Sequence, residues 1–262
     1  MTAVVAAEGV TVVRGGAPIV CDVGLELAPG ELVSIVGPSG AGKTTFLRAL
    51  AGEIEPEGGS VVLFGEAPAR ALEHATRRAV LPQSSMLNFA FTAFDVVMMG
   101  RAPHGRGPHR DAAIAQEALR RAGIGRLASR TYTSLSGGEK QRVHFARALA
   151  QIWEPPADGR RLLLLDEPTA SLDIAHAHSL LEQARRLTRE GASAIAVLHD
   201  LNLAAQYADR VMLMAKGRTV AIGPPAEVLE PDTLRAVFDI EVVVVHDDRL
   251  RVPIIAARTA TL

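Results

Sequence analysis

The chain has 262 residues, of which 48% are hydrophobic and 22% are charged, a composition typical of a soluble globular protein with an ample core. Its net charge of −1 argues against a general nucleic-acid binder, and its single cysteine excludes an intrachain disulfide and fits a reducing cytoplasm. No apolar run approaches the roughly 18 residues that cross a bilayer, and the N-terminus lacks the positively charged start of a signal peptide.

The first third of the chain predicts mainly strands, because short apolar stretches there are separated by turn residues. We expect strands at residues 4–13, 19–27, 31–36, 60–64 and 77–81, and a helix at residues 44–51. The dipeptide Gly15-Gly16, preceded by Arg14, marks the turn between the first two strands, and Pro29-Gly30 marks the next turn.

Helical periodicity dominates residues 84–150 and is interrupted by a basic loop at residues 101–110. The clearest helix, residues 111–122, starts with an aspartate and is followed by a glycine. Strands and helices then alternate, with strands at 161–165, 194–198 and 210–215 and helices at 176–189 and 201–208. This alternation predicts a largely parallel sheet with helices on both faces. Residues 242–245 and 250–255, around His246-Asp247-Asp248, predict a C-terminal hairpin.

Residues 37–44 match the phosphate-binding loop pattern G-x-x-x-x-G-K-[ST] in full and lie between a predicted strand and a predicted helix. Glycines let backbone N–H groups turn towards a phosphate, and the following helix start adds positive potential. Lys43 would contact the β- and γ-phosphates, and the Thr44 hydroxyl would bind Mg²⁺. The predicted nucleotide contacts here are Gly37, Pro38, Ser39, Gly40, Ala41, Gly42, Lys43, Thr44 and Thr45.

A run of four leucines, residues 162–165, precedes Asp166 and Glu167 and predicts a strand that is buried on both faces. At the end of this strand, Asp166 would hold the Mg²⁺ shell and Glu167 would polarise the attacking water as a general base. A carboxylate pair at a strand end can also cap the next helix, a reading that the phosphate-binding loop disfavours.

The most informative stretch is Leu135-Ser136-Gly137-Gly138-Glu139, at the start of a helix expected to continue through Arg147. Its backbone amides form a second anion-binding helix N-terminus. Ser136 and Glu139 also fit an ordinary capping box. The two readings are compatible, because the capped geometry is what presents the amides.

With these motifs and the following Lys140-Gln141-Arg142, the chain resembles the nucleotide-binding subunits of ATP-binding-cassette (ABC) transporters over almost its entire length. The resemblance implies an α/β fold: a P-loop NTPase (RecA-like) core with a mostly parallel sheet, an N-terminal antiparallel β subdomain and a helical signature subdomain. It implies one ABC ATPase domain over residues 1–262, with the β subdomain and core at about 1–83 and 161–220, the helical subdomain at about 84–160 and a C-terminal extension at about 221–262.

The resemblance also implies ATP and Mg²⁺ as cofactors and a head-to-tail dimer. In that dimer, the signature residues of one copy would contact the ATP held by the other copy; these residues are Ser136, Gly137, Gly138 and Glu139. Within one copy they would lie far from Lys43.

Further residues match family motifs one by one. Gln83 matches the glutamine that contacts Mg²⁺ and water, and His199 matches the switch histidine that contacts the γ-phosphate. Asp173, in Ser171-Leu172-Asp173, matches the D-loop at the dimer interface. Arg14 stands near the place where the family commonly has an adenine-stacking aromatic residue. A guanidinium can stack on a base, and a plain turn residue is an equal reading, so selectivity for adenine stays open.

The helical region carries more apolar residues than a small subdomain core needs, which favours a groove for a permease helix. These residues are Phe89, Phe91, Phe94, Val96, Val97, Met98 and Met99. The motif at residues 100–104 resembles ATPases of iron-siderophore, cobalamin and haem importers, and the insertion 153–160 and the context 81–85 resemble the haem branch. We expect the basic loop 101–110 to be solvated, with contact to anionic lipid as the alternative. His176 and His178 point to different helix faces and predict no metal or haem site.

The implied function is that of the ATP-hydrolysing subunit of a bacterial haem importer, peripheral on the cytoplasmic face of the inner membrane. Its partners would be a second copy, a polytopic permease dimer and, indirectly, a periplasmic haem-binding protein; no nucleic-acid partner is expected. The same role for a ferric siderophore or cobalamin is the alternative. A soluble ABC ATPase of DNA repair or translation is remote, because such proteins usually carry two cassettes or a long coiled coil. An exporter is disfavoured because a fused membrane domain is absent.

Overall fold

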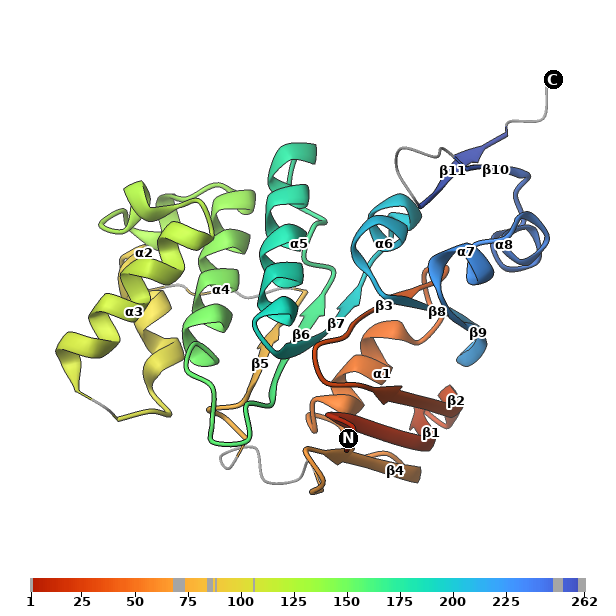
Figure 1. Ribbon diagram of the computed structural model, residues 1–262, viewed down its shortest axis with the longest axis horizontal. Coiled ribbons are helices and arrows are strands. Elements are labelled where there is room, and N and C mark those ends of the chain that lie inside the picture. Colours follow the sequence, from red (N-terminus) through yellow and green to blue (C-terminus); the bar gives the residue numbers. More distant parts are fainter. Residues whose placement is uncertain are drawn as a thin grey trace. The chain divides into compact units, whose positions relative to one another are not determined.

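A computed structural model describes residues 2–67, 74–83, 87, 89–105, 107–246 and 252–258. The chain forms two compact units, one of Met1–Pro68 with Ile195–Leu262 and one of Ala69–Ala194, and Figure 1 colours them along the sequence. Strand β7 (Ala192–Val197) crosses the boundary between them. Among the helices in the described ranges, none combines the length and hydrophobicity that a bilayer crossing requires.

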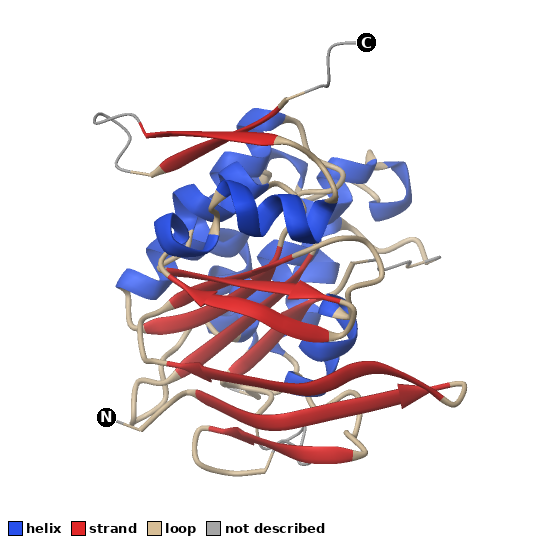
Figure 2. Cartoon of the chain, turned by 90° about the vertical axis from the view of Figure 1, so that its right-hand side faces the viewer, coloured by secondary structure: helices blue, strands red, loops and turns tan. Residues whose placement is uncertain are grey.

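The first unit begins with a three-stranded antiparallel sheet, shown as red arrows in Figure 2. Its strands are β1 (Val5–Arg14), β2 (Ala17–Leu27) and β4 (Gly58–Leu63), in the order β2-β1-β4. Gly15 and Gly16 join β1 to β2 with φ angles of 56° and 80°. Positive φ at both turn residues suits the twist of a tight hairpin, which confirms the predicted turn.

The other sheet strands of this unit follow the order β7-β3-β8-β9. All five residues of β3 (Leu32–Val36) are buried, and β3 pairs in parallel with β8 (Arg210–Ala215). The outer strand β9 (Arg218–Gly223) is antiparallel to β8 and was not expected from the sequence. Helix α1 (Lys43–Leu50) follows β3, and α6 (Leu201–Tyr207) follows β7.

The chain continues through two short helices, α7 (Pro225–Val228) and α8 (Pro231–Phe238), which the sequence did not predict. The predicted hairpin is confirmed as β10 (Val242–His246) and β11 (Pro253–Ala257), with its second strand later than expected. Its connecting residues 247–251 lie outside the described ranges. The side chain of Asn202, on α6, donates to the Ile255 carbonyl (3.1 Å) and accepts from the Ile255 N–H (2.7 Å). The hairpin is thereby attached to α6.

In the second unit, β5 (Arg78–Leu81) pairs in parallel with β6 (Arg161–Asp166), which neighbours β7. Every residue of β6 is buried, as the four leucines predict. Helix α5 (Ile174–Arg189) connects β6 to β7. This mostly parallel sheet and the antiparallel β sheet of the first unit confirm the expected α/β P-loop fold class.

The rest of this unit is helical, with α2 (Ala93–Met98), α3 (Pro108–Arg121) and α4 (Gly137–Gln151) packed together (Figure 1). Helix α3 begins three residues before the predicted start, because Pro108 occupies its first position, where the missing N–H costs nothing. Residues 99–101 form a 3₁₀ turn. The predicted loop is therefore shorter than residues 101–110.

The expectation that the basic segment is solvated or faces lipid is wrong for Arg101, whose side chain is 1% exposed. Its guanidinium pairs with Asp111 (2.8 Å) and Glu154 (2.6 Å) and donates to the Ala150 carbonyl (2.7 Å). His104 Nε2 lies 2.6 Å from the Gln151 carbonyl. These side chains satisfy the last carbonyls of α4, which have no partner within the helix.

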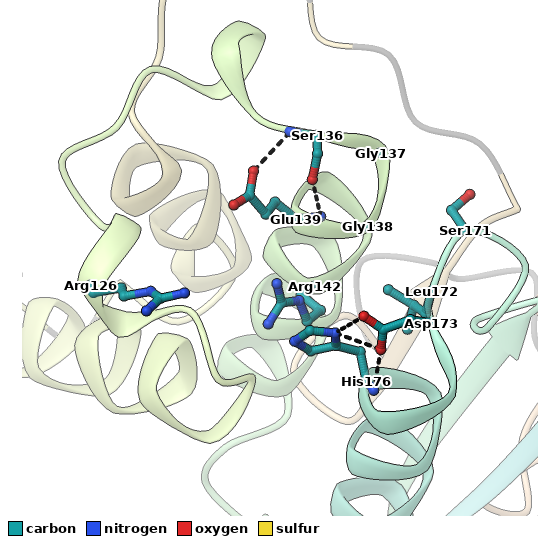
Figure 3. A pocket seen from close by; sticks show the side chains of 10 residues that line it. All are labelled: Arg126, Ser136, Gly137, Gly138, Glu139, Arg142, Ser171, Leu172, Asp173 and His176. Carbon is teal, nitrogen blue, oxygen red and sulfur yellow. Dashed lines mark hydrogen bonds and ion pairs between the residues drawn. The ribbon is translucent and has the colours of Figure 1, made fainter.

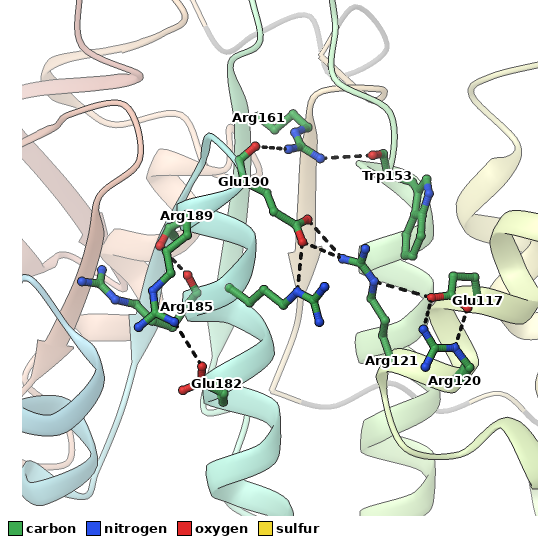
Figure 4. A network of polar contacts seen from close by, with 11 residues as sticks. Glu117, Arg120, Arg121, Trp153, Arg161, Glu182, Arg185, Arg189 and Glu190 are labelled. Carbon is green, nitrogen blue, oxygen red and sulfur yellow. Dashed lines mark hydrogen bonds and ion pairs between the residues drawn. The ribbon is translucent and has the colours of Figure 1, made fainter.

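A second polar network joins α3, α5 and the insertion after α4 (Figure 4). Arg121 pairs with Glu190 at 3.1 Å, and its guanidinium carbon lies 4.4 Å from the centre of the Trp153 ring. Arg161 donates to the backbone carbonyls of Trp153 (3.1 Å) and Glu190 (2.9 Å). The insertion at 153–160 is therefore packed into the unit through its first residues.

Candidate functional site

In the first unit, the phosphate-binding loop joins β3 to α1, as the sequence predicts. A side chain at either of two glycines would collide with neighbouring backbone. A Cβ on Gly37 would lie 2.0 Å from the Met214 carbonyl oxygen, and a Cβ on Gly42 would lie 2.6 Å from that of Ile19. Both glycines also have φ in the left-handed region, at 149° and 93°. The sharp loop therefore requires glycine at both positions.

Lys43 is the charged centre of this loop. Its side chain is buried, and Nζ donates to the carbonyls of Gly37 (2.7 Å) and Pro38 (2.9 Å). No side chain caps the start of α1, so the first amides of this helix keep the geometry of an anion site. Thr44 and Thr45 are half-buried at the same helix start. This donor set fits a nucleotide phosphate chain, with the Thr44 hydroxyl suited to Mg²⁺.

His199 and Arg14 lie in the same unit. His199 lies two residues after the end of β7 and is exposed. The next residue, Asp200, caps α6 by accepting from the N–H groups of Asn202 and Leu203. The Leu198 N–H donates to the Ile35 carbonyl (3.0 Å), which fixes the end of β7 on β3 just before the phosphate-binding loop. Arg14 is exposed at the last position of β1, opposite Ala17.

The acidic residues lie in the second unit. Asp166, the last residue of β6, is buried, and Glu167 follows it in the left-handed region with φ 49°. This conformation is uncommon for a residue with a side chain and is typical of functional sites. Gln83, two residues after β5, donates its amide to Glu167 at 2.9 Å. The parallel pairing of β5 and β6 thus brings together two predicted site residues.

The signature turn forms the capping box that the sequence predicts. Ser136 Oγ accepts from the Glu139 N–H (3.3 Å), and Glu139 Oε2 accepts from the Ser136 N–H (2.8 Å). The second of these bonds is the main reason why the pKa of Glu139 lies below its usual value. Ser136 and Gly137 are exposed at the start of α4, while Leu135 is buried and anchors the turn.

A pocket opens between the signature residues 136–139 and the D-loop residues 171–173 (Figure 3). Sequence reasoning gave no role here to three other lining side chains, Arg126, Arg142 and His176. A Cβ on Gly138 would lie 2.9 Å from the Ser171 carbonyl oxygen and 3.3 Å from the Leu172 side chain. Within one chain, the D-loop therefore packs so closely against the signature turn that position 138 has little room for a side chain larger than that of glycine.

Comparison with known proteins decides the family. The sequence profile described as "ABC transporter" matches residues 20–170. The chain is 52% identical to the hemin import ATP-binding protein HmuV of Gloeobacter violaceus, over 95% of this chain and 92% of that protein. The chain belongs to the ABC transporter family. It is also 49% identical to the hemin import ATP-binding protein HmuV of Pseudomonas aeruginosa, over 96% of this chain and 98% of that protein.

Among solved structures, the ABC chain is similar to a dimeric ATP-binding cassette in a post-hydrolysis state with ADP and Pi. The TM-score is 0.76 and the identity 27%, over 84% of this chain and 98% of that one. As in the rest of the ABC family, ATP is the nucleotide that such a chain binds.

The predicted excess of apolar residues lies around α2 of the second unit. Val96 and Val97 are fully buried in the core, whereas Phe89 is 69% exposed and Phe91 and Met99 are each 37% exposed. Phe89 and Phe91 also contact each other, with ring centres 5.9 Å apart. This ABC chain therefore exposes apolar side chains just before α2 and at its C-terminal end; Phe89, Phe91 and Met99 are here called the α2 patch. Residues 84–86 and 88, part of the segments cited for importer resemblance, lie outside the described ranges.

Proposed function

We propose that this chain is the ATP-hydrolysing subunit of a bacterial hemin importer. The observation that supports hemin as the cargo is the near full-length similarity to proteins named hemin import ATP-binding protein, at 46–52% identity. ATP hydrolysis itself accords with the phosphate-binding loop, the strand-end carboxylates and the signature turn. Residues 1–262 act as one ABC ATPase domain in this proposal.

Each residue has a defined part in the proposed reaction. Bound Mg-ATP supplies the phosphoanhydride bond and the charge of the metal, with Asp166, Thr44 and Gln83 as the groups that would hold Mg²⁺. The loop amides and Lys43 hold the phosphates, and His199 contacts the γ-phosphate. Glu167 accepts a proton from the attacking water. Its amide partner Gln83 orients the carboxylate.

The signature turn acts on the ATP of a second copy. Ser136 and the Gly137 and Gly138 amides form a donor-rich helix start, and Glu139 holds this start in its capped geometry. A head-to-tail dimer of identical chains would place this start, together with Asp173, against the phosphates bound by Lys43 of the other copy. The similarity to a dimeric cassette supports this arrangement.

The α2 patch is the proposed docking surface for the permease, because exposed Phe and Met side chains suit an apolar helix of a partner. Two copies would bind a polytopic permease dimer on the cytoplasmic face of the inner membrane. A periplasmic hemin-binding protein would deliver the cargo from the other side.

The test is transport by the complete complex, reconstituted with its permease in proteoliposomes. We expect ATP-dependent uptake of hemin that Glu167→Gln abolishes. Uptake of a ferric siderophore or cobalamin in place of hemin would overturn the cargo while retaining the importer role. A complex that hydrolyses no ATP would overturn the function itself.

A further inference from the structure

The D-loop carboxylate of Asp173 is held on both oxygens by a single residue, His176. Asp173 Oδ1 accepts from the His176 backbone N–H at 2.9 Å, and His176 Nδ1 lies 2.7 Å from Oδ1 and 2.8 Å from Oδ2 (Figure 3). A carboxylate accepts, so Nδ1 is the protonated ring nitrogen in these contacts. The side chains of Asp173 and His176 are 65% and 43% exposed.

The contact between the His176 imidazole and the Asp173 carboxylate is not required to cap helix α5. Asp173 is the N-cap of α5, and the backbone N–H of His176 alone completes that cap. The ring contact therefore acts on the orientation of the carboxylate. Without it, an exposed aspartate side chain retains more rotamer freedom, which must be lost when it meets a partner.

The carboxylate lies on the wall of the signature pocket. Ser171 and Leu172, just before Asp173, touch the position of Gly138, and Arg142 adds a nearby positive charge. Hydrogen bonds from His176, first from its backbone and then from its ring, hold the pKa of Asp173 below its usual value. Next to Asp173, Ile174 is 80% exposed. This corner of the unit presents an oriented charge beside an uncovered apolar side chain.

We infer that His176 is a positioning residue for ATP hydrolysis: its imidazole fixes the D-loop carboxylate in the orientation that the second copy meets. The inference rests on the proposed function, since it concerns the dimer in which Asp173 contacts the other copy. His176 touches no reacting atom. It acts through Asp173, which makes the effect of its removal depend on that residue.

The test is a double-mutant cycle in the full chain with His176→Ala and Asp173→Ser, because serine keeps the cap but removes the carboxylate. His176→Ala retains its backbone N–H, so we expect an unchanged thermal midpoint and ATP affinity, with kcat lower by about 10-fold and KM within about twofold. The double variant should match Asp173→Ser alone. His176→Gln, whose amide can donate to the carboxylate, should recover part of the rate.

The matched control is His178→Ala on the same helix, which we expect to keep its kcat. An unchanged kcat in His176→Ala, or multiplicative losses in the double variant, would overturn the inference. If the unmodified chain hydrolyses no ATP as a complex, the proposed function fails first, and that result is distinguishable from a failure at His176.

Discussion

The side-chain amide of Gln83 lies 2.9 Å from Oε2 of Glu167, to which it donates a hydrogen bond. Gln83 lies two residues after the end of β5, and Glu167 directly follows β6. Leu81 of β5 stands opposite Leu165 of β6 in the parallel register. The strand pairing therefore fixes the distance between the two chain segments. This hydrogen bond holds the Glu167 carboxylate, the proposed general base, at the end of β6.

Replacement of Glu167 with Gln should abolish turnover and keep ATP binding. The amide retains an oxygen that can accept from Gln83, but it cannot take a proton from water. We expect steady-state ATP hydrolysis to fall by at least about 100-fold and an ATP-bound dimer to accumulate in size-exclusion chromatography. Full retention of hydrolysis would remove Glu167 as the general base.

Replacement of Lys43 with Ala should weaken ATP binding by at least about 10-fold, because the loop loses the only ammonium that it encloses among its described residues. Isothermal titration calorimetry with ATP measures the change. Arg48→Ala is the matched control, since this exposed cation lies on the same helix one turn further on. Equal affinity in Lys43→Ala and the unmodified chain would contradict the phosphate contact.

Replacement of Ser136 tests the action of the signature turn on a second copy. Ser136→Arg should spare ATP binding by the single chain and abolish turnover. Because Ser136 also caps α4, this variant should lose about 1 kcal/mol of stability. Ser136→Asn keeps a capping side chain and so separates the two effects. Normal hydrolysis in Ser136→Arg would break the cross-subunit model, and denaturation midpoints check the cap.

Replacement of Arg101 with Met should destabilise the protein by about 3–5 kcal/mol, because Asp111 and Glu154 would remain buried without this partner. Arg110 also pairs with Glu154 but its side chain is 61% exposed, so Arg110→Ala should cost less than about 1 kcal/mol. Urea denaturation gives both values. A small loss in Arg101→Met would show that the network is not needed for the fold.

Acid should weaken the same network through Glu154. Burial raises the pKa of Glu154, but hydrogen bonds and charges from Arg101 and Arg110 outweigh it, and the folded pKa lies below the ordinary 4.5. A carboxylate whose pKa is lower in the folded than in the unfolded protein stabilises the fold at pH values above its unfolded pKa. This contribution is lost as the pH falls from 4.5 through the folded pKa. At pH values below 4.5, the free energy of unfolding should therefore decrease less steeply with falling pH in Glu154→Gln than in the unmodified chain. Identical slopes would contradict the assignment.

The nucleotide motifs were predictable because each depends on residues close together in sequence. The glycines of the phosphate-binding loop, the leucines before Asp166 and the serine of the signature turn all dictate local backbone geometry. Their predicted positions on strand ends and helix starts are confirmed, while their roles toward ATP stay predictions.

The side chains that link distant segments were not predictable. Arg101 looked like part of a solvated basic loop because its partners, Asp111 and Glu154, lie 10 and 53 residues away. His176 was considered only as a metal or haem ligand. The aspartate three residues before it was the available signal, since an N-cap and the third helical position meet at a helix start.

The Asn202 side chain joins β11, the last strand in the described part of the chain, to the first turn of α6, three residues after His199. A two-stranded hairpin has little stability alone, so its contacts with α6 and α8 help to hold it, among them the two hydrogen bonds of Asn202. Any event that shifts the backbone at His199 shifts this connection as well. A spectroscopic probe on the β10–β11 hairpin would therefore test whether ATP binding moves His199, the residue proposed to contact the γ-phosphate. A chimaera with a foreign C-terminal hairpin would need a free backbone N–H and carbonyl where Ile255 now pairs with Asn202.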